Sequence, residues 1–112
     1  MWLITTRGFY SVVADHHEDG HVLVRARVRE DLESLADLIP GLEVEETPER
    51  DYRFRASVPR DVWAAAATAL AGEIDYPNFK NAVADRQGPE RAHVYSDVWV
   101  TLLALQEGGR CG

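Results

Sequence analysis

The residue types best suited to chemistry gather between positions 76 and 101. His93, Asp97 and Thr101 follow one another at four-residue spacing, which places them on one face of a helix. A carboxylate beside a histidine can orient its imidazole ring. A catalytic triad would also need a nucleophile, and Ser96 lies on another helix face without the strand–turn–helix context of a serine hydrolase. We therefore predict no catalytic residue here, and the candidate binding residues are Tyr76, Asn78, Lys80, Arg91, His93 and Asp97.

Asn78 and Lys80 also have plain structural interpretations. Asn78 precedes an expected helix, where an amide side chain caps the first turn. Lys80 is the only lysine beside eleven arginines. It falls in the first turn of that helix, where a cation opposes the helix dipole. Its ammonium group therefore either pairs with a carboxylate such as Asp75 or Glu73, or faces an anionic ligand. The alternative for the rest of the segment is a polar helix face whose aromatic side chains pack inward.

Four arginines form a second candidate surface. Alternate positions of two strand-like segments hold them, so their side chains should point to the same side of a sheet. Guanidinium groups suit phosphate and carboxylate ligands. Glu43 and Glu45 alternate in the same way on a third segment, and cross-strand ion pairs would then neutralise the surface. Both interpretations stay open for Arg25, Arg27, Arg53 and Arg55.

A polar turn at residues 16–21 contains His16, His17 and His21 together with two acidic residues. These are metal-ligand types, but a specific metal site needs fixed geometry and supporting contacts that a short hairpin turn does not supply. We predict an exposed turn and no metal. The sequence also lacks a P-loop, paired cysteines and paired glycines of the kind that bind cofactors, so no cofactor is expected.

Length and composition predict one globular domain over residues 1–107, followed by a flexible tail at 108–112. The start of the chain lacks the apolar run of a signal peptide, and no segment approaches the roughly 20 apolar residues of a membrane helix. The single cysteine, Cys111, fits a reducing compartment. We therefore expect a cytoplasmic protein. Its net charge of −7 disfavours nucleic acid and anionic membranes and permits a basic partner.

An internal sequence repeat indicates the architecture. Residues 25–32 reappear thirty positions later, at 55–62, with Arg, Ala, Val and Asp in the same register. Each copy ends an alternating strand and begins a helix. We predict an α+β fold of two ββα units that form a four-stranded antiparallel sheet with helices on one face, plus two C-terminal helices. The first expected strand is 1–15, with a break near Arg7–Gly8 as the alternative. The other expected strands are 21–28, 42–46 and 52–58, and the expected helices are 29–39, 62–74, 78–87 and 89–107. Tyr52 and Phe54 should face the helices.

The chain resembles a family of small bacterial proteins of unknown function. The likeness covers the sequence up to Gln106 and is carried by residues 1–6, 8–13, 24–27, 75–80, 87–88, 91, 95, 98–99 and 105–106. It implies a bacterial origin and a single domain, and it implies no activity.

These observations favour a small acidic module that binds another protein and has no catalytic activity, with self-association left open. Two further classes remain. One is an immunity- or antitoxin-like inhibitor of a basic partner, which size and net charge would suit. The other is a small-molecule or enzymatic site near Lys80 and His93. A deep pocket lined by Lys80, Arg91 and His93 would favour the enzyme, and a flat exposed aromatic or acidic surface would favour binding.

Overall fold

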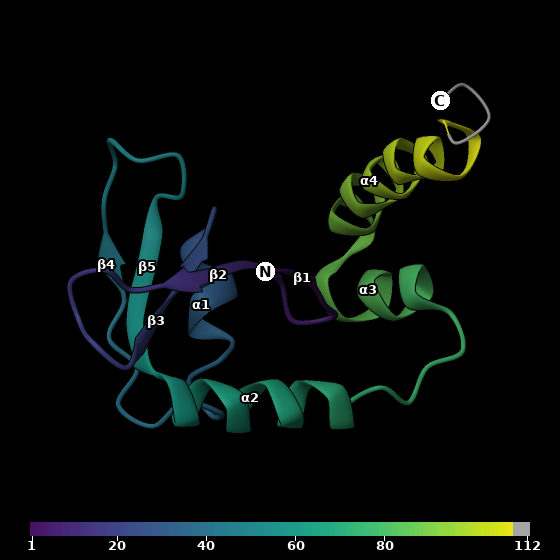
Figure 1. The fold of residues 1–112 in the computed structure, drawn as a ribbon. Helices are drawn as coiled ribbons and strands as arrows, with labels where there is room; N and C mark the ends of the chain where they lie inside the picture. Colours follow the sequence, from purple (N-terminus) through teal and green to yellow (C-terminus); the bar gives the residue numbers. More distant parts are fainter. Residues whose placement is uncertain (109–112) are drawn as a thin grey trace. The chain divides into compact units, whose positions relative to one another are not determined.

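The structure, a computed structural model, describes residues 1–108 (Figure 1). Of the predicted tail at 108–112, all but Gly108 lies outside the described residues. The chain divides into two compact units, Met1–Asp75 and Tyr76–Gly112, and each is described by itself. The first contains β1 (Trp2–Ile4), β2 (Phe9–Ala14), β3 (His21–Ala26), α1 (Arg29–Glu33), β4 (Glu45–Glu46), β5 (Phe54–Pro59) and α2 (Arg60–Gly72). The second contains α3 (Phe79–Gln87) and α4 (Pro89–Gly108).

The first unit is an antiparallel sheet covered on one face by helices, in agreement with the predicted α+β class. The strand order is β1-β2-β3-β5-β4. The sheet has five strands where the sequence predicted four, because the chain folds back between Thr5 and Gly8 and divides the expected first strand into β1 and β2. A backbone hydrogen bond from Thr5 N to Gly8 O, 2.9 Å, closes this turn. Three strands therefore precede α1, and the first half is not a ββα unit.

Alternation along the strands separates a buried face from an open one. Val22, Val24 and Ala26 of β3 are buried, as are Ala56 and Val58 of β5. They form one hydrophobic core with residues of the two helices and of the turns that follow α1, namely Leu32, Leu35, Ile39, Trp63, Ala66 and Leu70. Residues between the buried ones point to the opposite face, where no helix of this unit packs.

Tyr52 does not face the helices as predicted. Strand β5 begins at Phe54, so the alternation does not extend back to Tyr52, which lies in a bend. Its ring lies beneath two guanidinium groups of the open face, 4.6 Å from Arg25 and 4.4 Å from Arg27. Cation–π attraction accounts for this position. Phe54 packs against the edge of the core and is only half-buried.

Helix α1 is shorter than the predicted helix at 29–39. After Glu33 the chain continues in turns, with hydrogen bonds such as Leu38 N to Leu35 O spanning three residues. The Ser34 hydroxyl donates to the Asp31 carbonyl at 2.7 Å, which competes with regular helical bonding. Gly41, at φ +70°, then reverses the chain. The apolar spacing therefore predicted buried positions correctly and the helix length wrongly.

The two copies of the repeat meet in the sheet only at their first residues, because β3 and β5 are antiparallel and the rest of each copy runs in the opposite direction. Arg25 of β3 is the direct partner of Arg55 in β5. The helices that follow differ, since α1 has 5 residues and α2 has 13. Equivalence of the complete strand–helix units stays a prediction.

The second unit is a pair of packed helices. The Asn78 side chain accepts a hydrogen bond from Asn81 N at 2.9 Å and caps α3, and Gly88 at φ +100° separates α3 from α4. Val83 is fully buried. In the described part of the chain, no helix combines the length and apolarity needed to cross a membrane.

Candidate functional site

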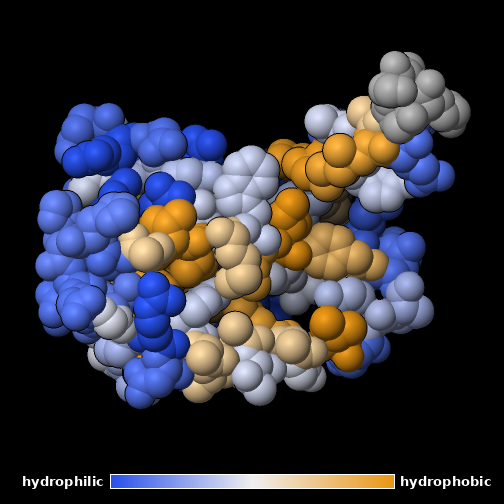
Figure 2. Space-filling model, viewed as in Figure 1, coloured by the Kyte–Doolittle hydropathy of each residue, from blue (hydrophilic) through white to orange (hydrophobic). Residues whose placement is uncertain are grey.

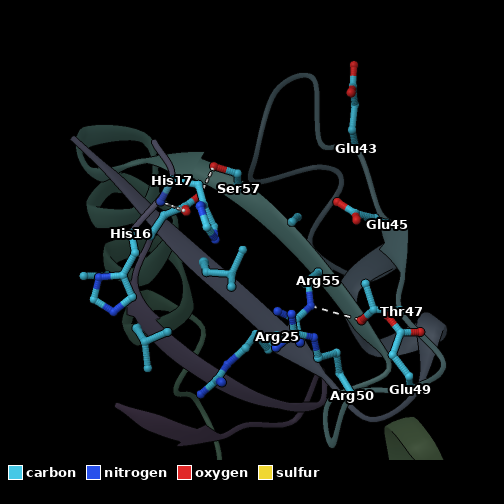
Figure 3. A pocket seen from close by; sticks show the side chains of 15 residues that line it. His16, His17, Arg25, Glu43, Glu45, Thr47, Glu49, Arg50, Arg55 and Ser57 are labelled. Carbon is cyan, nitrogen blue, oxygen red and sulfur yellow. Dashed lines mark hydrogen bonds between the residues drawn. The ribbon is translucent and has the colours of Figure 1, made fainter. Parts of the chain in front are cut away.

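A groove of about 660 Å³ lies on the open face of the sheet (Figure 3). Leu23, Ala56 and Val13 supply apolar parts of its lining. Arginines and glutamates line the same groove, namely Arg25, Arg50, Arg55, Glu43, Glu45 and Glu49. The groove therefore combines an apolar surface with charges of both signs.

Strand register aligns four residues in a row across the sheet. Ser11 of β2 is paired with Arg25 of β3, Arg25 with Arg55 of β5, and Arg55 with Glu45 of β4. Direct partners in an antiparallel sheet point to the same face. Two guanidinium groups are thus neighbours at the centre of the row, which is an unfavourable arrangement for like charges unless an anion offsets it.

Neutral groups hold Arg25 in place. Its Nη2 donates to the Ser11 hydroxyl at 2.7 Å, and Ser11 is only 1 % exposed. The guanidinium carbon lies over the Tyr52 ring, 4.6 Å from the ring centroid. Arg25 forms no ion pair with a carboxylate of the described residues. Its orientation is therefore fixed while its charge stays uncompensated.

Arg55 is held in the same way. Its Nε donates to Thr47 Oγ1 at 3.1 Å, and its Nη2 donates to the Tyr52 carbonyl at 3.2 Å. Within the described chain, neither Glu43 nor Glu45 forms an ion pair with Arg25 or Arg55, although Glu45 is the strand partner of Arg55. The hydrogen bonds to Thr47 and Tyr52 engage the guanidinium instead.

The other two arginines of the predicted surface are placed differently. Arg53 Nε lies 2.8 Å from a carboxylate oxygen of Glu46, so this exposed arginine is neutralised. Arg27 stacks on Tyr52 and donates to the Asp51 carbonyl at 2.8 Å. The structure therefore brings Arg25, Arg27 and Arg55 together around Tyr52 and pairs Arg53 with Glu46, which Arg29 also approaches to 3.8 Å.

At the opposite end of the groove, the lining residues Asp15 and Ser57 form a Ser–His–Asp set with His21, in which the serine is the central residue. Ser57 Oγ donates to Asp15 Oδ2 at 2.7 Å and lies 3.1 Å from His21 Nδ1. In a hydrolytic triad the histidine would stand between the other two and accept the serine proton. Here the carboxylate accepts it. The Ser57 hydroxyl, followed by the His17 backbone N–H, lowers the pKa of Asp15 below its ordinary 3.8.

The polar turn is exposed, with His16 and His17 both at the surface. His17 N donates to Asp15 Oδ1 at 2.9 Å, which shapes the turn. Across residues 1–108, the histidines, cysteines and carboxylates form no group of three or more able to hold a metal ion.

Part of the predicted site at residues 76–97 serves the packing of the second unit. Tyr76, Phe79 and Tyr95 form a chain of ring contacts with centroids 5.8 and 6.0 Å apart. Arg91 Nη1 donates to the Tyr95 hydroxyl at 3.1 Å. Together with the Asn78 cap, these contacts give three of the candidate residues a structural role.

Lys80, His93 and Asp97 lie at the surface. The nearest nitrogen and oxygen of His93 and Asp97 are 4.0 Å apart, and these side chains are 79 % and 74 % exposed. Within its own unit, Lys80 forms no ion pair with a carboxylate of the described residues, and Glu73, one of its two predicted partners, binds Arg7. The contacts do not bring Lys80 and His93 into a common polar network.

Helix α4 exposes large apolar side chains, and Figure 2 shows hydrophobic residues gathered over it. Trp99 is 62 % exposed and Leu105 77 %. Val94, Val100 and Leu102 are also exposed. This surface is mainly aliphatic, with Trp99 as the aromatic residue among those named.

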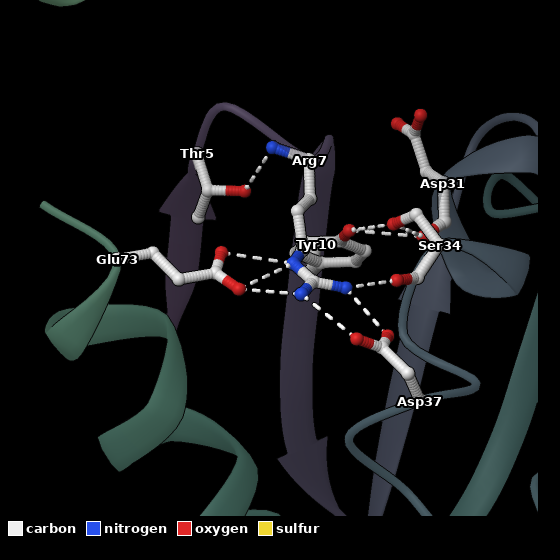
Figure 4. A network of polar contacts seen from close by, with 7 residues as sticks. All are labelled: Thr5, Arg7, Tyr10, Asp31, Ser34, Asp37 and Glu73. Atoms are coloured by element: carbon white, nitrogen blue, oxygen red, sulfur yellow. Dashed lines mark hydrogen bonds and ion pairs between the residues drawn. The ribbon is translucent and has the colours of Figure 1, made fainter. Parts of the chain in front are cut away.

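Sequence reasoning missed the cluster around Arg7 (Figure 4). Arg7 lies in the turn between β1 and β2, and its side chain is 7 % exposed. The guanidinium donates to Asp37, to the Ser34 carbonyl and to both carboxylate oxygens of Glu73. Hydrogen bonds to Glu73 and then Asp37 raise the pKa of Arg7 further above its usual range. The expected break at Arg7–Gly8 was the available signal, since a charged residue beside a glycine interrupts an apolar strand.

Comparison of the chain with protein-family models, with curated proteins and with solved structures gives no match. The resemblance to a bacterial family stays a prediction, and the contacts above are the basis for a function.

Proposed function

We propose that this protein is a binding module for another protein, and that the open face of the sheet receives an acidic side chain of the partner between Arg25 and Arg55. The observation that carries the proposal is the direct pairing of these two arginines, each bonded only to neutral oxygens. A carboxylate is the natural complement, because it accepts two hydrogen bonds from a guanidinium and offsets the repulsion between neighbouring cations.

Preorganisation strengthens this interpretation. Ser11 and Tyr52 hold Arg25, and Thr47 and the Tyr52 carbonyl hold Arg55. Binding then costs little side-chain entropy, since both guanidinium groups are already oriented. An apolar floor at Leu23 and Val13 lies in the same groove and suits the carbon atoms of a peptide segment.

Charge favours a protein over a nucleic acid as the partner. Glu43, Glu45 and Glu49 line the groove beside the arginines, and the whole chain carries a net charge of −7. A polyanion would gain from two arginines and be repelled by the rest of this surface. A folded or extended protein segment needs to supply only one acidic side chain at the right place.

The contacts of the side chains best suited to catalysis favour a binding protein over an enzyme. The Ser57 proton is directed at Asp15, and His93 and Asp97 are exposed on a helix surface. The proposal includes the cytoplasmic location that the composition favours. The alternative, an inhibitor of a basic partner, would bind through its carboxylates. Loss of Arg25 and Arg55 should then strengthen binding to the partner, whereas under the present proposal it weakens binding.

The test follows the side-chain Nε–Hε signals of the arginines by NMR during titration with a short acetylated, amidated acidic peptide. We expect the signals of Arg25 and Arg55 to shift, and a basic peptide of the same length to leave them unchanged. The double variant Arg25→Gln, Arg55→Gln, followed by the backbone amide signals of β3 and β5, should bind the acidic peptide at least tenfold more weakly, since two charge-assisted contacts are lost.

Arg53→Gln is the matched control, because Arg53 already pairs with Glu46 on the same sheet. It should leave the affinity for the acidic peptide within about twofold. Equal losses in the double variant and the control, or no shift at Arg25 and Arg55, would contradict the proposal.

A further inference from the structure

The glutamates beside the arginine pair point to a second charge on the bound segment. We infer that the segment is dipolar: a basic side chain two residues from its acidic one meets Glu45 while the acidic side chain meets Arg25 and Arg55. This inference rests on the proposed function and names the chemistry of its ligand.

Glu45 is the strand partner of Arg55, yet their charges do not neutralise each other. Arg55 is held by Thr47 and the Tyr52 carbonyl, and Glu45 is exposed. In the residues that the structure describes, Glu45 forms no ion pair. A carboxylate and a guanidinium thus lie on neighbouring strands and both remain available to an external group.

Strand geometry sets the spacing between the two charges of the ligand. Neighbouring strands lie about 4.8 Å apart, so Glu45 is roughly 7 Å from the midpoint of the Arg25–Arg55 pair. In an extended peptide, side chains on the same side recur every second residue, again about 7 Å apart. A segment that crosses the strands therefore presents Glu-x-Lys, in either chain direction, in register with the row.

The same arrangement excludes a purely acidic segment. A second carboxylate two residues from the first would lie against Glu45, with Glu43 and Glu49 in the same groove. Like charges at this distance repel. The groove would therefore select one negative charge and reject a run of them, which gives a specificity that an isolated arginine pair lacks.

The test compares four acetylated, amidated peptides that share a Gly-Ser background and differ at three central positions. Glu-Ser-Lys has the inferred spacing. Glu-Lys-Ser has the same composition with the charges on opposite sides of an extended chain. Glu-Ser-Ser is the single-acid reference, and Glu-Ser-Glu is the diacid. Dissociation constants come from the Arg25 and Arg55 Nε–Hε shifts.

We expect Glu-Ser-Lys to bind about threefold more tightly than Glu-Ser-Ser, the effect of one exposed ion pair. Glu-Lys-Ser should gain nothing, and Glu-Ser-Glu should bind more weakly. Glu45→Gln should abolish the advantage of Glu-Ser-Lys without weakening Glu-Ser-Ser, and Glu45→Lys should make Glu-Ser-Glu the preferred peptide.

The outcomes separate the two proposals. If Glu-Ser-Ser binds through the arginines and Glu-Ser-Lys binds equally well, the dipolar inference is wrong and the proposed function stands. An advantage of Glu-Ser-Lys that survives Glu45→Gln would also overturn the inference. If none of the acid-containing peptides shifts Arg25 and Arg55, both proposals fall.

Discussion

Arginine side chains in two regions of the first unit differ in burial and in the groups that accept their hydrogen bonds. Arg7 is almost fully buried, and two carboxylates and a backbone carbonyl accept its hydrogen bonds. Arg25 and Arg55 lie on the open face, where they bond only to hydroxyl and carbonyl oxygens. Neutral acceptors orient a guanidinium without cancelling its charge, whereas carboxylates do both. The identity of the acceptor thus separates a structural arginine from an arginine available to a partner.

The position of each group in the fold explains the difference. Arg7 joins the β1–β2 turn to the turns after α1 through Asp37 and to the end of α2 through Glu73. These segments are far apart in the sequence, and the guanidinium has five N–H groups with which to link them. Arg25 and Arg55 join only adjacent strands that the sheet already holds together.

Replacing Arg7 should produce the largest effect. Arg7→Met keeps most of the buried volume and removes the hydrogen bonds that Arg7 donates to Glu73 and to the Ser34 carbonyl. We expect a loss of about 3 kcal/mol in the free energy of unfolding, the lower end for a broken buried pair because the Asp37 side chain is 66 % exposed and can be solvated.

Urea unfolding measures this loss, and Arg7→Lys is the control that keeps a charge without the planar fork. It should recover only part of the stability. A loss below about 1 kcal/mol for Arg7→Met would mean that the cluster is no more structural than a surface ion pair.

Gly8→Ala tests the same region by sterics. A Cβ at Gly8 would lie 2.5 Å from Asp31 Cγ, and Asp31 is buried with its carboxylate accepting from Phe9 N at 3.0 Å. The backbone of Gly8 has no positive φ, so close approach and not conformational freedom requires the glycine. We expect a loss of about 1–3 kcal/mol in the free energy of unfolding.

Gly72→Ala is the matched control, because nothing lies within 4 Å of its added Cβ. Alanine in this last position of α2 should be neutral or stabilise by up to about 1 kcal/mol. Similar losses at Gly8 and Gly72 by urea unfolding would remove the steric explanation.

Replacing an arginine of the Arg25–Arg55 pair should not lower the stability of the fold as the replacement of Arg7 does. Arg55→Gln relieves repulsion from Arg25, so the free energy of unfolding should change by no more than about 1 kcal/mol and rise at low salt. Added salt should reduce this gain, because it screens the repulsion in the unchanged protein. Thermal unfolding at low and high salt measures both terms, and a salt-independent loss above about 2 kcal/mol would show that Arg55 is structural like Arg7.

The sequence correctly predicted structural features that depend on residues a few positions apart. Alternation correctly placed Val22, Val24 and Val58 on the buried face. The sequence also predicted the Asn78 cap and the approximate extent of α2 and α4. These features depend on residues a few positions apart, so a local pattern contains the necessary information.

Long-range contacts were beyond such patterns. Nothing near Arg7 in the sequence indicates that Glu73, 66 positions later, would be its partner. Glu43 and Glu45 had the spacing to neutralise Arg25 and Arg55, but β4 forms only at Glu45–Glu46, and Thr47 takes the Arg55 hydrogen bond. Which acceptor each arginine finds depends on tertiary register, and that choice separates the two regions.

The smallest predicted effect concerns the carboxylate at the far end of the groove. Asp15 accepts a hydrogen bond from Ser57 Oγ at 2.7 Å and one from His17 N at 2.9 Å, and these lower its pKa. A carboxyl whose pKa is lower in the folded state stabilises the fold above its unfolded pKa and loses that contribution as pH falls through the folded value. Ser57→Ala removes the larger cause, so the pKa of Asp15 should rise towards its ordinary 3.8 while staying slightly below it, because the His17 N–H remains. NMR titration of the Asp15 carboxyl carbon measures this directly.

The affinity for the single-acid peptide near pH 7 should not change, since Asp15 is ionised there in both proteins and Arg25 and Arg55 keep their contacts. An unchanged Asp15 pKa would show that the backbone of the turn, and not Ser57, sets the charge at this end of the groove.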